Sequence, residues 1–429
     1  MYKQYKKAIT KAFPNVRIPE PRVSKLAILI IKILGRLYLF LYYGVAHILL
    51  YDDKIILDAF ERALAGKSRC IIAFRHPNGG EPQLLTWFFL FKLKVIAAKR
   101  GISLARPPHA VFVYGYEVVR WGGWAPRYMM PNLGAMPIHH SKLDRSGMNR
   151  IYKAITEGLY PLALAPEGQV SYTTDSVPRL EPGIFRMGFR AAEQLISTKP
   201  DCPVEILPVS FHFRFGPWGR KITENLLKRI EKLCGLYSRD NKKKPTAERL
   251  RLSREHILEV NERRYRIKSN PALPFEERLD NVINKALETA EQMLGMSSEG
   301  DLFSRMYLVR QHCWDRIFLP NLGSLKGFSD IERNVKDLEA GEAWYITRHQ
   351  EIVDFCWYFR KSLPDENTVY HNYVEYVQNL WDFASRTMGG AYANRVSVFP
   401  RKVIIDVSPP INLSERLSSF KTDKKTAIE

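Results

Sequence analysis

The chain has 429 residues, of which 45% are hydrophobic and 26% charged, and this composition excludes a disordered or fibrous protein. Its 65 Lys and Arg against 45 Asp and Glu give a formal charge of +20, which suits an anionic partner, either nucleic acid or a membrane surface. Five cysteines lie far apart without a CxxC pair, which argues against a disulfide framework and a structural zinc site and suits a reducing compartment.

The N-terminal 50 residues combine positive charge with the most apolar stretch of the chain. They hold nine Lys and Arg and one acid, and residues 26–50 are long enough to span a bilayer, which takes about 20 residues. Polar side chains recur along this stretch at intervals of seven and four residues, and they would form one narrow stripe on a helix: Lys25, Lys32, Arg36, Tyr43 and His47. An apolar helix with a basic stripe is typical of a helix that lies in the membrane interface.

We therefore predict that residues 1–50 form a basic N-terminus and an amphipathic helix on the cytoplasmic face of the cytoplasmic membrane, where anionic lipids attract lysines. A full span would place Arg36 near the bilayer centre, at a cost of about 2.5–3.5 kcal/mol. A short span over 33–50 is one alternative, and a buried helix of a soluble protein is the other. Because the basic block runs into this apolar segment, membrane lipids are the expected partner, and nucleic acid is not.

Short apolar runs alternate with helical stretches from residue 51 to residue 218. Buried strands are predicted at 70–74, 111–114, 135–138, 161–165 and 204–210, and helices at 84–96, 147–158 and 183–197. This alternation is typical of an α/β fold, in which functional residues gather in loops at the carboxyl ends of strands. We predict a mixed β-sheet flanked by helices.

The loop after the first of these strands contains His76 and Glu81, with Gly79 and Gly80 between them. On a continuous helix the two side chains would point about 140° apart, but a loop that two glycines make adaptable can bring them together. A carboxylate that orients a histidine makes it a general base for an alcohol. The alternative is a surface loop with an incidental histidine and a helix-capping glutamate.

Three further segments follow in chain order: Gly-Ala-Met-Pro-Ile-His-His-Ser at 134–141, Ala-Pro-Glu-Gly-Gln-Val-Ser at 165–171 and Ile-Leu-Pro-Val-Ser at 206–210. With the His76–Glu81 pair they resemble the four blocks of the glycerolipid acyltransferase family, which includes the glycerol-3-phosphate and lysophosphatidic acid acyltransferases. The family's blocks are an HxxxxD pair, a GxxFxxR segment, a PEG segment and a VPV strand. The likeness extends over about residues 70–212.

The resemblance implies a membrane-associated O-acyltransferase of phospholipid biosynthesis or remodelling. His76 would deprotonate a hydroxyl of a lysophosphatidic acid-like acceptor, and Glu81 would hold the histidine ring. The alkoxide would attack the thioester of acyl-CoA or of an acyl-carrier protein as co-substrate, with no cofactor and no metal. Pro166, Glu167 and Gly168 would shape the acceptor site, since a glycine lets backbone approach the ligand closely.

The sequence departs from the family pattern at three positions. Glu81 stands where the family has Asp, and His140 and Val170 stand where it has the two arginines expected to bind phosphate bidentately. Their place could be taken by other basic residues: Lys142, Arg145 or Arg179. If none of them does so, the acceptor is a lipid without a phosphomonoester. A non-catalytic, membrane-bound lipid-binding or scaffold protein is the alternative from another functional class.

Residues 219–399 are predicted to be a mainly helical insertion, and residues 400–429 to supply the family's last strand and a tail. Helices are expected at 221–236, 246–268, 276–296 and 329–363. The lysine run at 241–245 is predicted to be a solvated loop; contact with anionic lipid or with an acidic carrier protein is the functional alternative. His349 and Asp354 repeat the HxxxxD spacing, but on an uninterrupted helix, and we interpret them as a coincidence.

Overall fold

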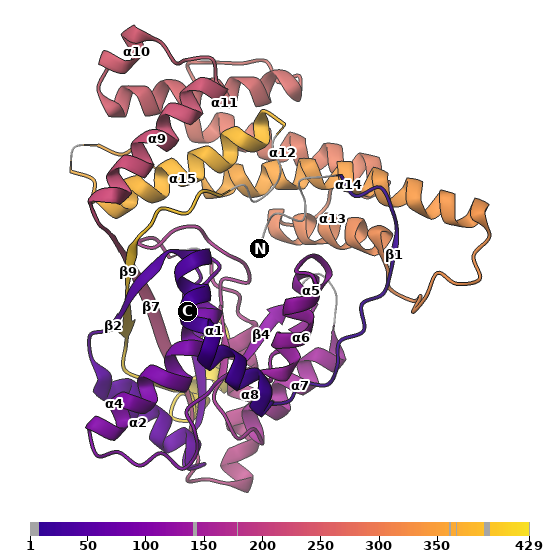
Figure 1. Cartoon of the computed structure of the whole chain (residues 1–429). Coiled ribbons are helices and arrows are strands. Elements are labelled where there is room, and N and C mark those ends of the chain that lie inside the picture. The colour runs from indigo at the N-terminus through magenta and orange to yellow at the C-terminus, as the bar shows by residue number, and fades with distance from the viewer. Residues whose placement is uncertain are drawn as a thin grey trace. The chain divides into compact units, whose positions relative to one another are not determined.

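The computed structural model describes residues 8–139, 144–177, 179–359, 362–365, 367–389 and 395–428 (Figure 1). The chain divides into two compact units. The α/β unit comprises Ile18–Gly216 and Phe399–Glu429, and the helical unit comprises Met1–Arg17 and Pro217–Val398.

The α/β unit is built on a mixed sheet, which confirms the predicted fold class. Its strands are β2 (Val45–Leu50), β3 (Arg69–Phe74), β4 (Val111–Gly115), β5 (Met136–Ile138), β6 (Leu162–Leu164), β7 (Val204–Phe215), β9 (Arg401–Val407) and β10 (Ile411–Asn412). The order is β2-β9-β7-β3-β6-β4-β5, with β10 also paired to β7. β7 runs antiparallel to β9 and β10, whereas the other pairs are parallel. The strands predicted from the apolar runs are therefore present, and the segment after the insertion completes the sheet.

Helices flank this sheet (Figure 1). They are α1 (Lys25–Tyr43), α2 (Asp53–Leu64), α3 (Glu81–Trp87), α4 (Lys94–Lys99), α5 (Glu117–Trp121), α6 (Trp124–Asn132), α7 (Arg145–Thr156), α8 (Gly183–Thr198) and α16 (Leu417–Thr422), with a π-helical segment, η2 (Phe88–Leu93), between α3 and α4. One core cluster joins Ile71 of β3 to Ile151 of α7, Phe189 of α8 and Leu413. Burying these apolar side chains holds β3 in place, and the candidate site follows that strand.

The apolar stretch predicted as one helix over 26–50 is two elements, so the prediction is wrong for its second half. α1 ends at Tyr43, and Gly44, at φ 63°, caps it with its N–H directed to the carbonyls of Leu39 and Phe40. A left-handed glycine ends a helix in this way because it has no Cβ to clash. Residues 45–50 then form β2 beside β9, so His47 lies on a strand and the alternative span over 33–50 is also wrong.

One face of α1 packs on the α/β unit. Gly35 fits against Trp87, because an added Cβ would lie only 2.9 Å from the indole Cδ1 atom. Arg36 donates to the carbonyls of Val45, at 2.6 Å, and Ala46. These contacts tie the helix to β2 and to α3.

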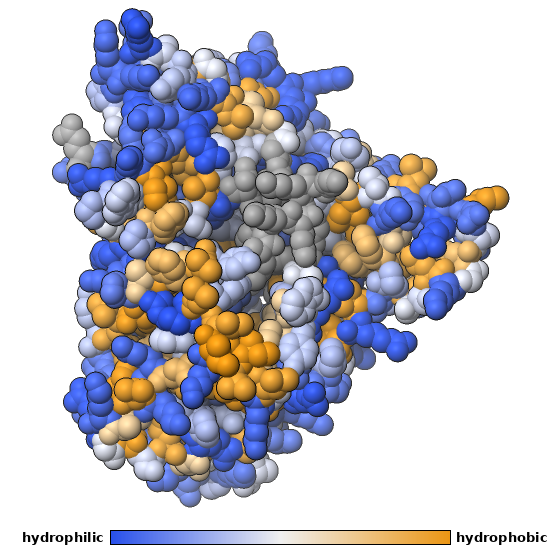
Figure 2. Space-filling view, viewed as in Figure 1, coloured by the Kyte–Doolittle hydropathy of each residue, from blue (hydrophilic) through white to orange (hydrophobic). Residues whose placement is uncertain are grey.

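The other face of α1 is apolar and exposed. Its outward side chains include Leu29, Ile33, Leu37 and Leu41, and Ile33 is 67% exposed. Figure 2 shows a hydrophobic patch over this part of the molecule. Among the described residues α1 is the one helix long and apolar enough to cross a membrane.

The helical unit holds α9 (Pro217–Leu233), α10 (Arg239–Lys243), α11 (Thr246–Arg264), α12 (Phe275–Leu294), α13 (Leu302–Ile317), α14 (Asp330–Tyr358) and α15 (Tyr370–Thr387). Four of these lie close to the helices predicted there. The lysine run at 241–245 was predicted to be a loop, but its first part belongs to α10, where Ser238 caps the helix by accepting from the backbone N–H of Asn241. Residues 8–17 also belong to this unit: β1 (Phe13–Pro14) pairs with β8 (Phe318–Leu319).

Three successive joints in the helical unit share one construction. Each has a buried glutamate near the end of one helix and an arginine at the fourth position of a following helix, with the short α10 between α9 and α11 in the first joint: Glu231 with Arg249, Glu262 with Arg278, and Glu291 with Arg305. In each pair the guanidinium Nε and Nη2 atoms bind both carboxylate oxygens, at 2.6–2.9 Å. The residue four positions after each glutamate has a positive φ and turns the chain out of the helix. The motif is therefore a repeated structural joint.

Candidate active site

The candidate site begins where β3 ends, on the loop that leads into α3. His76 lies two residues beyond the strand, and Glu81 is the first residue of α3. Gly79, at φ 86°, lies in the left-handed region that favours glycine and turns the loop back. A short loop therefore connects the buried strand β3 to the helix α3. The two predicted catalytic residues lie near its beginning and at its end.

The structure brings His76 and Glu81 together. The Nδ1 atom of His76 lies 2.8 Å from Oε2 of Glu81, and the backbone N–H of Gly79 donates to the same oxygen at 2.8 Å. The Glu81 side chain is 1% exposed and that of His76 is 17% exposed. Because Nδ1 is held by the carboxylate, Nε2 is the ring nitrogen left for a substrate, and no described residue bonds to it.

Glu81 stands where the glycerolipid acyltransferases have Asp, and its position at the start of α3 suits the longer side chain. Glu81 stands in the first turn of α3, where the positive end of the helix dipole favours a carboxylate. Its longer side chain reaches back over Gly79 to the histidine. The histidine–carboxylate contact is thus present with the extra methylene group.

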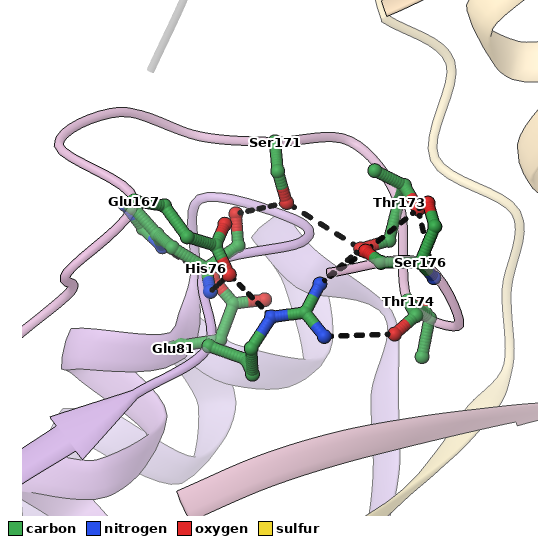
Figure 3. Close-up of polar contacts among 8 residues, drawn as sticks. His76, Glu81, Glu167, Ser171, Thr173, Thr174 and Ser176 are labelled. Atoms are coloured by element: carbon green, nitrogen blue, oxygen red, sulfur yellow. Dashed lines mark hydrogen bonds and ion pairs between the residues drawn. The ribbon is translucent and has the colours of Figure 1, made fainter. Parts of the chain in front are cut away.

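The turn that contains Pro166, Glu167 and Gly168 lies against the same loop (Figure 3). Glu167 Oε1 accepts from the backbone N–H of His76 at 3.2 Å, and the backbone N–H of Ser171 donates to the His76 carbonyl at 3.0 Å. Gly168 has φ 71°, a left-handed conformation that suits glycine. The second predicted group is therefore in direct contact with the first.

Arg75 joins the two groups, and the sequence did not single it out as a site residue. Its Nε atom donates to Glu167 Oε1, and Nη2 donates to the carbonyls of Thr173 at 3.0 Å and Ser176 at 2.8 Å. Nη1 donates to the carbonyl of Thr174 at 3.3 Å. Four of the five guanidinium N–H groups are thus used in holding this loop. The feature of the sequence that could have identified Arg75 as a site residue is its position directly before His76.

Two carboxylate oxygens in the site are buried without a hydrogen-bond partner among the described residues. They are Oε1 of Glu81 and Oε2 of Glu167. Leaving a buried acceptor unpaired costs about 1–3 kcal/mol, more for a charged group. Both glutamates thus have one oxygen fixed by the loop and one buried oxygen without a described partner.

Two distant segments also touch the loop. Arg401, at the start of β9, donates from Nη2 to Oδ1 of Asn78 at 2.9 Å. Tyr43, the last residue of α1, lies against Gly80, where an added Cβ would be 2.6 Å from the ring Cδ1 atom. Neither contact could be predicted from the sequence, because both join residues far apart in the chain.

The residues predicted to bind phosphate belong to other segments of the chain than the His76 loop. Arg145 is exposed at the start of α7, and Arg179 is exposed as well. His140 and Lys142 lie outside the described residues. No group of His, Cys, Asp or Glu among the described residues is arranged to hold a metal ion.

The second HxxxxD pair behaves differently. His349 and Asp354 both lie on α14, as predicted. His349 Nδ1 is 3.0 Å from the Tyr265 hydroxyl, whereas Asp354 accepts from Arg310 Nη2 at 3.0 Å. Burial lowers the pKa of His349. The pair does not form a dyad.

Comparison with known proteins adds no relative. No protein-family model matches the chain, and no curated protein is significantly similar to it. The resemblance to the glycerolipid acyltransferases therefore depends on the four short segments, and a function based on it is a proposal.

Proposed function

We propose that the chain is a membrane-associated O-acyltransferase. It transfers a fatty acyl group from acyl-CoA or an acyl-carrier protein to a hydroxyl of a glycerolipid acceptor of the lysophosphatidic acid type. The observation that carries the proposal is the 2.8 Å contact between His76 Nδ1 and Glu81 Oε2 beside the Pro166–Glu167–Gly168 turn. This arrangement supports general-base chemistry on an alcohol.

The proposed reaction needs one proton carrier. Nε2 of His76 accepts the proton of the acceptor hydroxyl while the oxygen forms a bond to the thioester carbonyl carbon. Glu81 stabilises the imidazolium through Nδ1–H and keeps its own charge. The tetrahedral intermediate collapses, the carbon–sulfur bond breaks, and the thiol leaves with the proton that His76 returns. The products are an ester and a free thiol, and the histidine is neutral again.

The exposed face of α1 supports the membrane part of the proposal. A helix with an apolar face and basic side chains such as Lys25 and Lys32 can lie at the surface of an anionic bilayer. Its last residue, Tyr43, contacts Gly80 of the candidate loop. A lipid acceptor in the interface would therefore reach a loop that is attached to the lipid-facing helix. We assign the protein to the cytoplasmic face of the cytoplasmic membrane.

A second candidate is acyl transfer to a lipid without a phosphomonoester. It is favoured by the charges at the site, where Arg75 is occupied by Glu167 and the loop carbonyls. The two unpaired carboxylate oxygens attract hydrogen-bond donors and repel a phosphate. A sugar lipid or an aminolipid offers such donors.

An acceptor panel tests both candidates. The purified full chain in lipid–detergent micelles would receive labelled acyl-CoA or acyl-carrier protein, with lysophosphatidic acid, glycerol 3-phosphate, monoacylglycerol and a lyso-aminolipid as acceptors. Transfer to the phosphate acceptors supports the first candidate, and transfer restricted to the others supports the second. If no acceptor is acylated, while the chain still binds vesicles, both are rejected in favour of a lipid-binding scaffold.

A further inference from the structure

The helical unit contains an open cleft of about 630 Å³, a size in the range of small-molecule sites. Its walls come from the first turns of α9, α11 and α15. α9 and α15 lie side by side (Figure 1), and Arg220 and Arg229 of α9 stack on Tyr370 and Trp381 of α15. The cleft lies outside the candidate active site and none of its residues takes part in the proposed reaction.

The cations that line the cleft are held by aromatic rings. The Arg220 guanidinium lies 5.3 Å from the ring centre of Tyr370, and the Lys221 ammonium lies 5.8 Å from that of Trp218. Neither forms an ion pair with a carboxylate of the described residues. A cation on an aromatic face keeps its full charge and its N–H donors, so both remain able to bind an anion.

The acids that line the cleft are already engaged. Glu224 pairs with Arg249 Nη1 at 3.0 Å. Asp365 accepts from the backbone N–H of Asn367 at 3.0 Å and from the Thr368 hydroxyl at 2.8 Å. The formal charges of these four lining residues sum to zero, and Arg220 and Lys221 are the charged groups that keep N–H donors for a ligand.

An aromatic wall stands beside these cations. Tyr370 and Tyr373 both line the cleft, with ring centres 6.2 Å apart and planes inclined by 28°. Burial raises the pKa of the Tyr370 hydroxyl, so the ring stays neutral at physiological pH. Aromatic rings next to Arg and Lys are the surroundings that a nucleobase and a phosphate use together.

We propose that this cleft binds an adenosine phosphate, with the phosphate on Arg220 and Lys221 and the purine against Tyr370 and Tyr373. The same chemistry is found in a free nucleotide and in the adenosine end of coenzyme A. The proposal does not depend on acyl transfer, because the cleft and the His76 loop share no residue.

Calorimetry on the full chain with ATP tests the proposal. Saturable binding is expected, and Arg220→Ala should weaken it about tenfold or more because the phosphate loses a charged donor. Lys221→Gln should act in the same direction. Arg229→Ala is the matched control. Arg229 is also an exposed arginine of α9, and its guanidinium lies 4.3 Å from the ring centre of Trp381 on α15, but it does not line the cleft. Its ATP affinity should equal that of the unaltered chain.

Coenzyme A, adenosine and pyrophosphate show which adenosine phosphate the cleft binds and which parts of it contribute to the affinity. Coenzyme A that competes with ATP assigns the cleft to the adenosine end of that cofactor, and absence of competition assigns it to a free nucleotide; either result upholds the proposal. Adenosine alone and pyrophosphate alone should each bind at least tenfold more weakly than ATP. Three results would overturn it: no saturable ATP binding, equal loss in Arg220→Ala and Arg229→Ala, or pyrophosphate binding as tightly as ATP.

Discussion

Buried glutamates occur in both units, but their hydrogen bonds differ. In the helical unit Glu231, Glu262 and Glu291 each receive two guanidinium nitrogens, one on each oxygen. In the α/β unit Glu81 and Glu167 each have one oxygen bound twice and the other not bound by any described residue. The joint carboxylates, with both oxygens satisfied, hold helices together, whereas the two carboxylates of the site each keep one buried oxygen without a described partner, as Asp382 also does in the helical unit.

The same comparison separates the two histidines with HxxxxD spacing. His76 shares its carboxylate with a loop and leaves Nε2 available, whereas His349 bonds to a tyrosine and its spacing partner Asp354 is bound to an arginine. Spacing alone therefore does not define a dyad. The local backbone does: Gly79 and Gly80 turn the chain back, and a continuous α14 separates the other pair.

The largest effect is expected at Glu81. Glu81→Gln should lower kcat/KM for acyl transfer by about 10²–10⁴-fold, because the neutral amide does not stabilise the imidazolium. The free energy of unfolding should change by less than about 1 kcal/mol, since the substitution also removes a buried charge with an unpaired oxygen. Glu81→Asp, which restores the charge, should keep most of the activity. Equal activity of the unaltered chain, Glu81→Gln and Glu81→Asp would contradict a catalytic role for the Glu81 carboxylate.

The matched substitution in the helical unit should lower stability and leave acyl transfer unchanged. Glu262→Gln should cost about 3 kcal/mol of stability because Arg278, which is 5% exposed, loses a bidentate partner. Urea unfolding and hydrogen exchange of the α11 and α12 amides measure this loss. Acyl transfer per folded molecule should stay unchanged. A fall in transfer without a fall in stability would contradict the assignment of this joint to the fold.

Substitution of Arg75 should affect acyl transfer less than substitution of Glu81, because Arg75 forms an ion pair with Glu167 beside the site. Arg75→Lys keeps the charge but cannot bind Glu167 and the loop carbonyls together. We expect KM for the acceptor to rise about tenfold, with a smaller change in kcat. Arg305→Lys, which alters the equivalent pair with Glu291, is the control and should leave KM unchanged.

The smallest effect is a dependence of stability on pH. Burial raises the pKa of the Glu262 carboxyl, but hydrogen bonds from Arg278 and Ser269 and the Arg278 charge outweigh it and bring the pKa below its ordinary value of 4.5. A carboxyl with a lowered pKa in the folded state stabilises the fold above its unfolded pKa. This contribution should disappear as the pH falls below 4.5 toward the folded pKa. Urea unfolding between pH 6 and pH 3 should show a shallower loss in Glu262→Gln, and an identical slope would contradict the pairing.

Much of the fold could be predicted from the sequence, because strands and amphipathic helices have distinct apolar periods. The end of α1 could not, since residues 26–50 are mostly apolar on both sides of Gly44 and period alone does not separate a buried strand from a helix. Two of the repeated joints have a signal in the sequence: Pro-Thr-Ala-Glu-Arg at 245–249 and Pro-Phe-Glu-Glu-Arg at 274–278 share their Pro, second-last Glu and Arg. Their glutamate partners lie 18 and 16 residues earlier, however, and pairing over that distance depends on the turn between the helices.

The candidate site could be predicted in part. The His76–Glu81 contact and the nearby Glu167 followed from local glycines and from the family resemblance. The contacts of Arg75 and Arg401 did not, because their acceptors are loop groups that only the folded chain brings near.

The central claim is that the His76 imidazole, held by Glu81, removes a proton from a lipid hydroxyl during acyl transfer. The most direct test is the transfer rate of the purified chain, of His76→Ala and of His349→Ala on the best acceptor of the panel. We predict a fall of about 10²–10⁴-fold for His76→Ala and an unchanged rate for His349→Ala. A His76→Ala protein that transfers acyl groups at the unaltered rate would contradict the claim.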